Sequence, residues 1–179
     1  MAKFEKAKGY EDLDFNLPTR KTFNSAGYDF EVIEDITIPT YSSQIRNMTE
    51  FVSQLPRNAG LIDMARFTKE TGQRPTLIPT GVKCKLDPGT YLELVLRSST
   101  PLKYWLVMAN SVGIIDADYY GNPDNDGAMY FQVINLGPRP IHLHKGDIIG
   151  QGIIHAFGIT EDDVALGNRM GGFGSTSNN

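Results

Sequence analysis

Two aspartates and two tyrosines lie next to one another in the middle of this chain. Residues 113–121 read Gly-Ile-Ile-Asp-Ala-Asp-Tyr-Tyr-Gly, so Asp116 and Asp118 follow an apolar pair. Aspartate is uncommon inside a strand, whereas carboxylates near aromatic rings, between glycines that let the backbone bend, are typical of a polar pocket. Carboxylates act as general bases, and in an extended strand these two would share one face. An exposed hairpin with its polar residues outward is the alternative interpretation.

Groups that suit phosphate oxygens occur in three other segments. Arg97 is followed by Ser98 and Ser99, and a planar guanidinium beside hydroxyl donors matches a phosphate group. Gln151 follows a turn and can donate from its amide. Residues 171–176 read Gly-Gly-Phe-Gly-Ser-Thr, in which glycines let backbone N–H groups converge on an anion and the phenyl ring can stack on a base. Each motif alone is weak evidence, and a glycine-rich end can also be a flexible tail.

Alternating apolar and polar residues predict that short strands position these groups. Turn residues such as Asp87-Pro88-Gly89 and Gly137-Pro138 separate the alternating segments. The predicted strands are 82–86, 91–96, 104–108, 129–134, 141–143 and 148–157. Many short strands between Pro and Gly turns favour an all-β sandwich or barrel.

A helical period interrupts the strands between residues 42 and 72. Apolar residues recur at helical spacing from a cap at Ser42 or Ser43 to Pro56, which ends the first helix. Asn58 is the predicted cap of a second helix that ends near Gly72. We interpret this helical insertion near 42–72 as a surface insertion, and the alternative is a docking site for an unidentified protein partner.

Composition limits the class of protein. The chain has 179 residues, of which 40% are hydrophobic and 21% are charged, which suits one folded domain with a core. A net charge of −4 argues against general nucleic-acid binding. The single cysteine, Cys84, is expected to be a buried thiol in a strand. No apolar run suits a membrane span and the N-terminus lacks the apolar part of a signal peptide, so a cytoplasmic protein is expected.

The order of these motifs resembles the trimeric, all-β dUTPase family, whose members hydrolyse dUTP to dUMP and pyrophosphate. The resembling segments are 25–30, 97–99, 110–121, 146–151 and 171–176, with Pro79-Thr80-Gly81 and Asn135 in addition. The likeness covers residues 17–40 and 77–176 and leaves out the helical insertion. It implies a single domain over residues 1–179 that folds as a distorted jelly-roll-like β-barrel with a flexible glycine-rich lid at 167–179. It also implies Mg²⁺ as cofactor and a homotrimer whose active sites are shared between chains.

The resemblance implies a role for each residue of the central stretch. Asp116 would be the catalytic base that orients or deprotonates the attacking water, with the second acid in support. The backbone of the hairpin, including Gly113 and Ile115, would read the uracil edge with help from the Asn110 side chain. Cytosine would leave buried partners unpaired. Tyr119 would stack on the deoxyribose and leave no room for a 2′-hydroxyl.

The resemblance also implies which residues hold the phosphates. Arg97, Ser98, Ser99 and Gln151 resemble the donors of the family's phosphate site. Mg²⁺ would be held mainly by the substrate's own phosphates and by water, with Asp29 supporting it indirectly. In the tail, Phe173 would stack on the uracil, and the residues that wrap the phosphates correspond to Gly174, Ser175 and Thr176.

This chain departs from the family pattern at two places. The tail from Arg169 to Phe173 is one residue shorter than usual, so Arg169 would reach the γ-phosphate only if the tail flexes. Residues 122–127 read Asn-Pro-Asp-Asn-Asp-Gly and are interpreted as the turn of a lengthened hairpin. Val133 stands where a calcium loop requires Glu, which argues against calcium.

Two other functions stay open on the sequence alone. One is the related dCTP deaminase, either by itself or as a bifunctional deaminase and dUTPase. The other is a regulatory binding protein whose helical insertion docks a partner, with the bound nucleotide acting as the switch.

Overall fold

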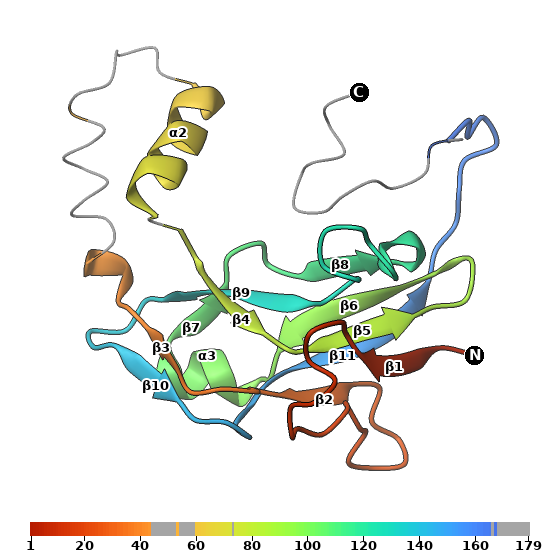
Figure 1. The fold of residues 1–179 in the computed structure, drawn as a ribbon, viewed down its shortest axis with the longest axis horizontal. Coiled ribbons are helices and arrows are strands. Elements are labelled where there is room, and N and C mark those ends of the chain that lie inside the picture. Colours follow the sequence, from red (N-terminus) through yellow and green to blue (C-terminus); the bar gives the residue numbers. More distant parts are fainter. Residues whose placement is uncertain (44–52, 54–59, 73, 166, 168–179) are drawn as a thin grey trace.

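Short strands are the main regular structure of the molecule (Figure 1). The computed structural model describes residues 1–43, 53, 60–72, 74–165 and 167. The strands are β1 (Lys3–Lys6), β2 (Tyr28–Glu31), β3 (Ile36–Ile38), β4 (Thr76–Pro79), β5 (Val82–Lys85), β6 (Thr90–Leu96), β7 (Leu106–Met108), β8 (Gly113–Asp116), β9 (Tyr130–Asn135), β10 (Ile141–Leu143) and β11 (Ile148–Ala156). Among the described residues, the helices are α2 (Leu61–Thr71), α3 (Ser99–Tyr104) and the 3-10 helix η1 (Ala117–Tyr119), and residues 41–43 are helical as well.

The strands pair side by side in antiparallel order. The largest sheet has the order β2-β11-β6-β8, another has the order β4-β9-β7, and β1-β5 and β10-β3 form two-stranded sheets. Each of these pairings is antiparallel. The all-β class that the sequence predicts is therefore confirmed, because strands dominate and the helices are few.

One core connects the sheets, and strand alternation selects its residues. On β6 the side chains of Leu92 and Leu94 are buried, while those of Tyr91 and Glu93 are half-buried. On β9 the ring of Phe131 packs edge-to-face on Phe30 of β2, with ring centroids 5.8 Å apart. Other members of the core lie on several strands or directly before one: Ile38, Ile78, Val82, Leu106, Met129 and Val133. This shared core fixes the position of β6 relative to β9.

The single cysteine lies in this core, as the sequence predicts. The Cys84 side chain is 2% exposed, and burial raises the pKa of its thiol to about 12. Alkylating reagents attack the thiolate, so we expect Cys84 to resist iodoacetamide in the folded protein and to react once denaturant unfolds the chain. Mass spectrometry of the alkylated protein measures this difference. Rapid labelling under native conditions would contradict the burial.

The raised pKa of Cys84 also sets the sign of a pH effect on stability. The folded state favours the protonated thiol, so this contribution to stability is present below the unfolded pKa. It is lost as the pH rises from the ordinary thiol range toward 12.

The predicted strand 104–108 is wrong at its start. The residues Ser99–Tyr104 form α3, and β7 begins only at Leu106. Pro101 lies in the first turn of α3, where its missing N–H costs no helical bond. Trp105 then ends the helix with a left-handed φ of 56°. A helix of 6 residues is too short to show a periodic apolar stripe, so the sequence pattern does not reveal it.

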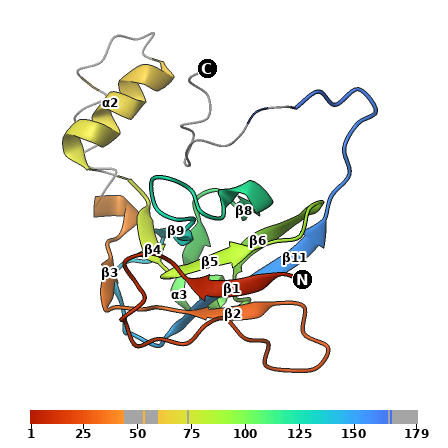
Figure 2. The same cartoon turned by 45° about the vertical axis from the view of Figure 1, so that its right-hand side comes forward.

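Helix α2 stands away from the sheets and is the longest described part of the insertion (Figures 1 and 2). It ends as predicted at Gly72, which caps it with a φ of 67°. Its N-cap is Gly60 rather than Asn58, and the Gly60 N–H donates to the Asp63 carboxylate at 2.9 Å. Most of the first predicted helix lies outside the described residues. Among the helices in the described part of the chain, none has the length and apolarity that crossing a membrane requires.

Candidate active site

Strand β8 ends at Asp116 and lies at the edge of the largest sheet. It pairs with β6, and Asp116 lies opposite Tyr91 in that register. An edge strand leaves the N–H and C=O groups of its outer side beyond the ladder, where a ligand can pair with them. Gly113 allows β8 to approach β6 closely, since a Cβ there would lie 3.2 Å from Cβ of Leu94. Strand β8 therefore places backbone groups outside the ladder next to a carboxylate. The lengthened hairpin that the sequence predicts is not formed, because β9 pairs with β4 and β7 in another sheet and not with β8.

A pocket of ≈ 180 Å³ lies beside β8, η1 and the start of β9. Its lining includes predicted site residues, namely Asn110, Gly113, Ile115, Asp116 and Tyr119. The Asn110 side chain is exposed in the turn before β8, whereas Tyr119 is only 7% exposed. The structure thus brings together the residues that the sequence predicts to contact a base, a sugar and a water.

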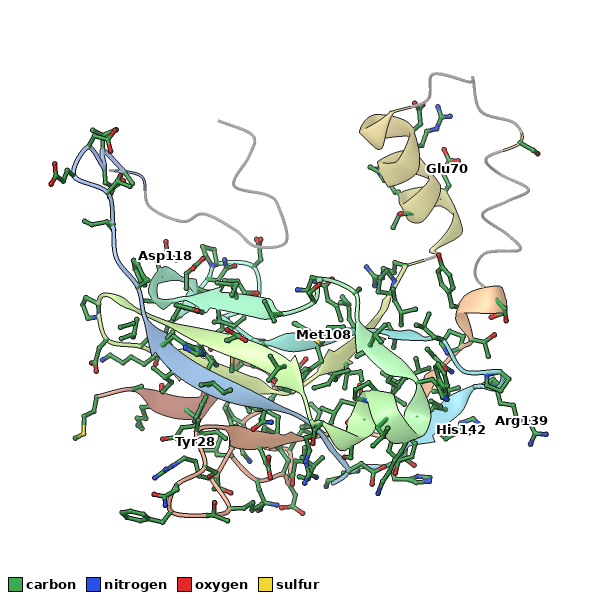
Figure 3. The ribbon with its side chains drawn as sticks, turned by 180° about the vertical axis from the view of Figure 1, so that it is seen from behind. Tyr28, Glu70, Met108, Asp118, Arg139 and His142 are labelled. Carbon is green, nitrogen blue, oxygen red and sulfur yellow. The ribbon has the colours of Figure 1, made fainter. Side chains whose placement is uncertain are left out.

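Asp116 and Asp118 do not share a face, contrary to the expectation from an extended strand. Strand β8 stops at Asp116, which is the N-cap residue of η1, and Asp118 lies inside this 3-10 helix. A 3-10 helix repeats every three residues or so, not every two. Asp118 is consequently exposed on the outside of the molecule (Figure 3), and of the two acids it is Asp116 that lines the pocket.

The pocket wall also contains residues that were not predicted from the sequence: Ile114, Ala128, Met129, Tyr130 and Gln132. Tyr130 and Gln132 alternate on β9 with the buried Phe131 and Val133, so they form the more polar face of that strand. This alternation, visible in the sequence, is the signal that could have identified them. Burial and a hydrogen bond with Tyr10 raise the pKa of Tyr130 to about 12.

The predicted phosphate donors lie toward the other end of β6. Arg97 directly follows β6 and borders a second pocket, of ≈ 310 Å³, beside α3. Gln151 of β11 lies opposite Val95, which is four residues along β6 from Tyr91, the partner of Asp116. Four strand residues span about 13 Å. Within one chain, the structure does not bring Arg97 or Gln151 to Asp116.

Arg97, Gln151 and three more predicted residues, Asp29, Ser98 and Ser99, lie toward this end of the largest sheet, and we call them its donor end. Asp29 of β2 is the other strand partner of Gln151. The Gln151 side chain covers Gly27, where an added Cβ would lie 1.9 Å from its Oε1 atom, so a larger residue there would displace the Gln151 amide. Ser98 is exposed at the N-cap of α3, and Ser99 begins that helix. Polar groups suited to an anion are therefore concentrated at the donor end.

The predicted residues of the tail lie outside the described part of the chain: Arg169, Phe173, Gly174, Ser175 and Thr176.

Within the described part, no group of three or more His, Cys, Asp or Glu side chains is placed to hold a metal ion. Mg²⁺ is often bound by one or two carboxylates, with phosphates and water as its other ligands. The donor set here fits a Mg²⁺ that arrives with a phosphate ligand, not a metal in an all-protein cage.

Comparison with known proteins places this arrangement in a family. The dUTPase family model matches residues 62–177. The deoxyuridine 5′-triphosphate nucleotidohydrolase of Lactococcus lactis is 35% identical over 97% of this chain and 95% of its own length.

Solved structures agree with the sequence comparison. The dUTPase of Streptococcus mutans has a TM-score of 0.65 and 32% identity, over 88% of this chain and 98% of its own. A variant dUTPase of the S. aureus phage phi11, described with a coordinated structural Mg(II) ion, shares the fold at 15% identity and a TM-score of 0.59. That match covers 93% of this chain and 97% of the phage protein. The likeness to solved dUTPases confirms the predicted dUTPase-like fold, and the chain belongs to the dUTPase family.

Proposed function

We propose that this chain hydrolyses dUTP to dUMP and pyrophosphate. The observation that carries the proposal is the pocket at β8, where an edge strand, Asn110 and Tyr119 surround the Asp116 carboxylate. The similar protein of Lactococcus lactis is named for the same reaction, which supports the proposal.

The outer edge of β8 recognises the uracil. Uracil presents an acceptor, a donor and an acceptor, and the backbone N–H and C=O groups between Gly113 and Ile115 can complement this pattern with the Asn110 amide. Cytosine presents a donor where uracil has an acceptor, and each protein group left unpaired costs about 1–3 kcal/mol. The Tyr119 ring lies against the sugar and leaves no space for a 2′-hydroxyl. Base and sugar are therefore selected by shape and hydrogen bonding in one pocket.

Asp116 accepts a proton from the water that attacks the α-phosphorus. The water oxygen forms a bond to this phosphorus as the bond to the α,β-bridging oxygen breaks, and pyrophosphate leaves. The carboxylate is half-buried at the end of β8, where the strand pairing with Tyr91 holds its backbone. A base fixed in this way contributes typically about 10²–10⁴-fold to a rate.

The donor end of a neighbouring chain supplies the phosphate contacts. A donor to the attacked phosphoryl group has to lie close to Asp116, whereas Gln151 of the same chain is about 13 Å away along β6. A homotrimer that sets Arg97, Ser98, Ser99 and Gln151 of one copy against the pocket of the next would complete the site. When bound, Mg²⁺ would offset the charge of the triphosphate. Asp29, beside Gln151, would hold one of its waters.

The C-terminal tail acts as a lid over the bound nucleotide in this proposal. Phe173 stacks on the uracil, while Gly174, Ser175 and Thr176 wrap the β- and γ-phosphates, and Arg169 contacts the γ-phosphate. Closure of such a segment excludes water from the reacting groups.

A pyrophosphate-release assay with dUTP, dCTP, dTTP and UTP tests the proposed function. We expect kcat/KM for dUTP to exceed that for dCTP by about a hundredfold, since one or two protein hydrogen-bonding groups lose their partners. Equal rates for the four nucleotides would contradict base recognition by β8. Ammonia release from dCTP would instead identify a deaminase.

A further inference from the structure

Residues 121–128 form a loop that folds back onto Tyr119, and we call it the clamp loop. The Nδ2 amide of Asn125 donates to the Tyr119 hydroxyl at 2.7 Å. The same hydroxyl donates to the carbonyl oxygen of Ala128 at 3.4 Å. The N–H of Asn122 donates to the Tyr119 carbonyl oxygen at 3.2 Å. The ring and the backbone of Tyr119 are thus both tied to the clamp loop.

The amide of Asn125 is itself held in one orientation. Its Oδ1 atom accepts from the Gly127 N–H at 3.1 Å, so its Nδ2 atom is directed to Tyr119. Gly127 has a φ of 83°, and a Cβ there would lie 2.6 Å from the Tyr119 carbonyl oxygen. Only glycine tolerates both conditions. The backbone of the clamp loop is therefore shaped to bring the Asn125 amide onto the ring.

An ion pair fastens the clamp loop to the rest of the fold. The Asp126 carboxylate accepts from Nζ of Lys83 on β5 at 2.6 Å and from the Lys8 N–H at 2.9 Å. Lys83 also lies over the ring of Tyr120, 4.9 Å from its centroid, and the Tyr120 hydroxyl donates to Glu5 of β1. Tyr120, which precedes the clamp loop, and Asp126, which follows Asn125, are thus both anchored to the β1-β5 sheet.

We propose that Asn125 is a positioning residue that fixes the Tyr119 ring and thereby sets the preference for deoxyribose over ribose. This inference rests on the proposed hydrolysis of dUTP. Tyr119 lines the pocket and Asn125 does not, so Asn125 acts through Tyr119. A ring held at its hydroxyl by Asn125 and Ala128 cannot tilt away from the sugar. Since a 2′-hydroxyl adds a single oxygen atom, a small tilt of the ring is enough to admit it.

Steady-state kinetics with dUTP and UTP test this role. We expect Asn125→Ala to lower the ratio of kcat/KM for dUTP to that for UTP about tenfold, because a ring displaced by a fraction of an ångström no longer excludes the ribose. Asp124→Ala is the matched control, since this exposed side chain belongs to the same loop and does not line the pocket. It should leave the ratio unchanged.

A double-mutant cycle separates positioning from a general structural effect. Tyr119→Phe removes the hydroxyl that Asn125 holds, so Asn125→Ala should change the ratio less than about twofold in that background. An equal loss of activity on both nucleotides in Asn125→Ala, or an undiminished effect on the ratio in the Tyr119→Phe background, would overturn the proposal. If Asn125→Ala does not fold, Tyr119→Phe cuts the same bond from the ring side, and an unchanged ratio in that variant would also overturn it. A wild-type chain without activity on dUTP would refute the proposed function, and the inference with it.

Discussion

An Asp116→Asn variant is expected to turn over dUTP about 10²–10⁴ times more slowly than the wild-type chain, because it lacks the carboxylate that accepts the water proton. Asparagine has nearly the same shape, and the Asp116 side chain makes no capping hydrogen bond to η1. The backbone of β8 and η1 should therefore keep its conformation. The loss should fall on kcat, with KM nearly unchanged, since the interaction matters in the transition state. Pyrophosphate release measures kcat, and calorimetry with a non-hydrolysable dUTP analogue measures binding.

The control for this experiment removes a carboxylate of the clamp loop that follows η1. Asp124 is exposed and does not line the pocket, so Asp124→Asn should retain kcat within about twofold of the wild type, as surface substitutions commonly do. Wild-type turnover by Asp116→Asn would exclude Asp116 as the base. Loss of analogue binding in Asp116→Asn would assign Asp116 to substrate binding instead.

Local periodicity accounts for the parts of the fold that the sequence predicts well. The alternation of Leu92 and Leu94 with polar neighbours predicts β6 and its buried face, and the bounds of β10 agree fully with the predicted 141–143. Gly72 marks the end of α2 because a left-handed cap favours glycine. The pocket residues from Asn110 to Tyr119 are close in sequence, so one continuous segment, the turn before β8, β8 itself and η1, brings them together.

The parts that the sequence does not predict depend on short helices and on contacts between distant segments. The 3-10 helix η1 turns Asp118 away from Asp116. It has only 3 residues, which is too short to leave a periodic pattern in the sequence. The pairing of Lys83 with Asp126, which anchors the clamp loop, joins β5 to a turn that is distant in the sequence. The distance of Arg97 from Asp116 follows from the register of β6 with β8, which only the assembled sheet defines. This last separation has the largest consequence, because it divides the residues of one site into two groups.

Mixing two inactive variants is expected to restore activity if these two groups meet between chains. Asp116→Asn damages the pocket and Arg97→Ala damages the donor end, so each variant alone should have less than about 1% of wild-type activity. In trimers formed at random from equal amounts of both, a site is intact when an Arg97→Ala chain supplies Asp116 and an Asp116→Asn chain supplies Arg97. This combination occurs at about a quarter of the sites of a cyclic trimer. Co-refolding the two variants and measuring pyrophosphate release from dUTP tests it.

The matched control is a mixture in which no chain carries an intact pocket. Asp116→Asn mixed with the double variant Asp116→Asn, Arg97→Ala forms the same interfaces and contains no Asp116, so it should stay inactive. Two different affinity tags on the two variants establish that mixed oligomers have formed. Mixed oligomers without recovered activity would mean that Asp116 and Arg97 act within one chain. The roughly 20 Å that six strand residues span from Tyr91, the partner of Asp116, to Arg97 would then have to close by a movement of β8 toward the donor end. Recovery near a quarter would instead explain why a chain whose fold keeps Asp116 and Arg97 apart can still act on one triphosphate.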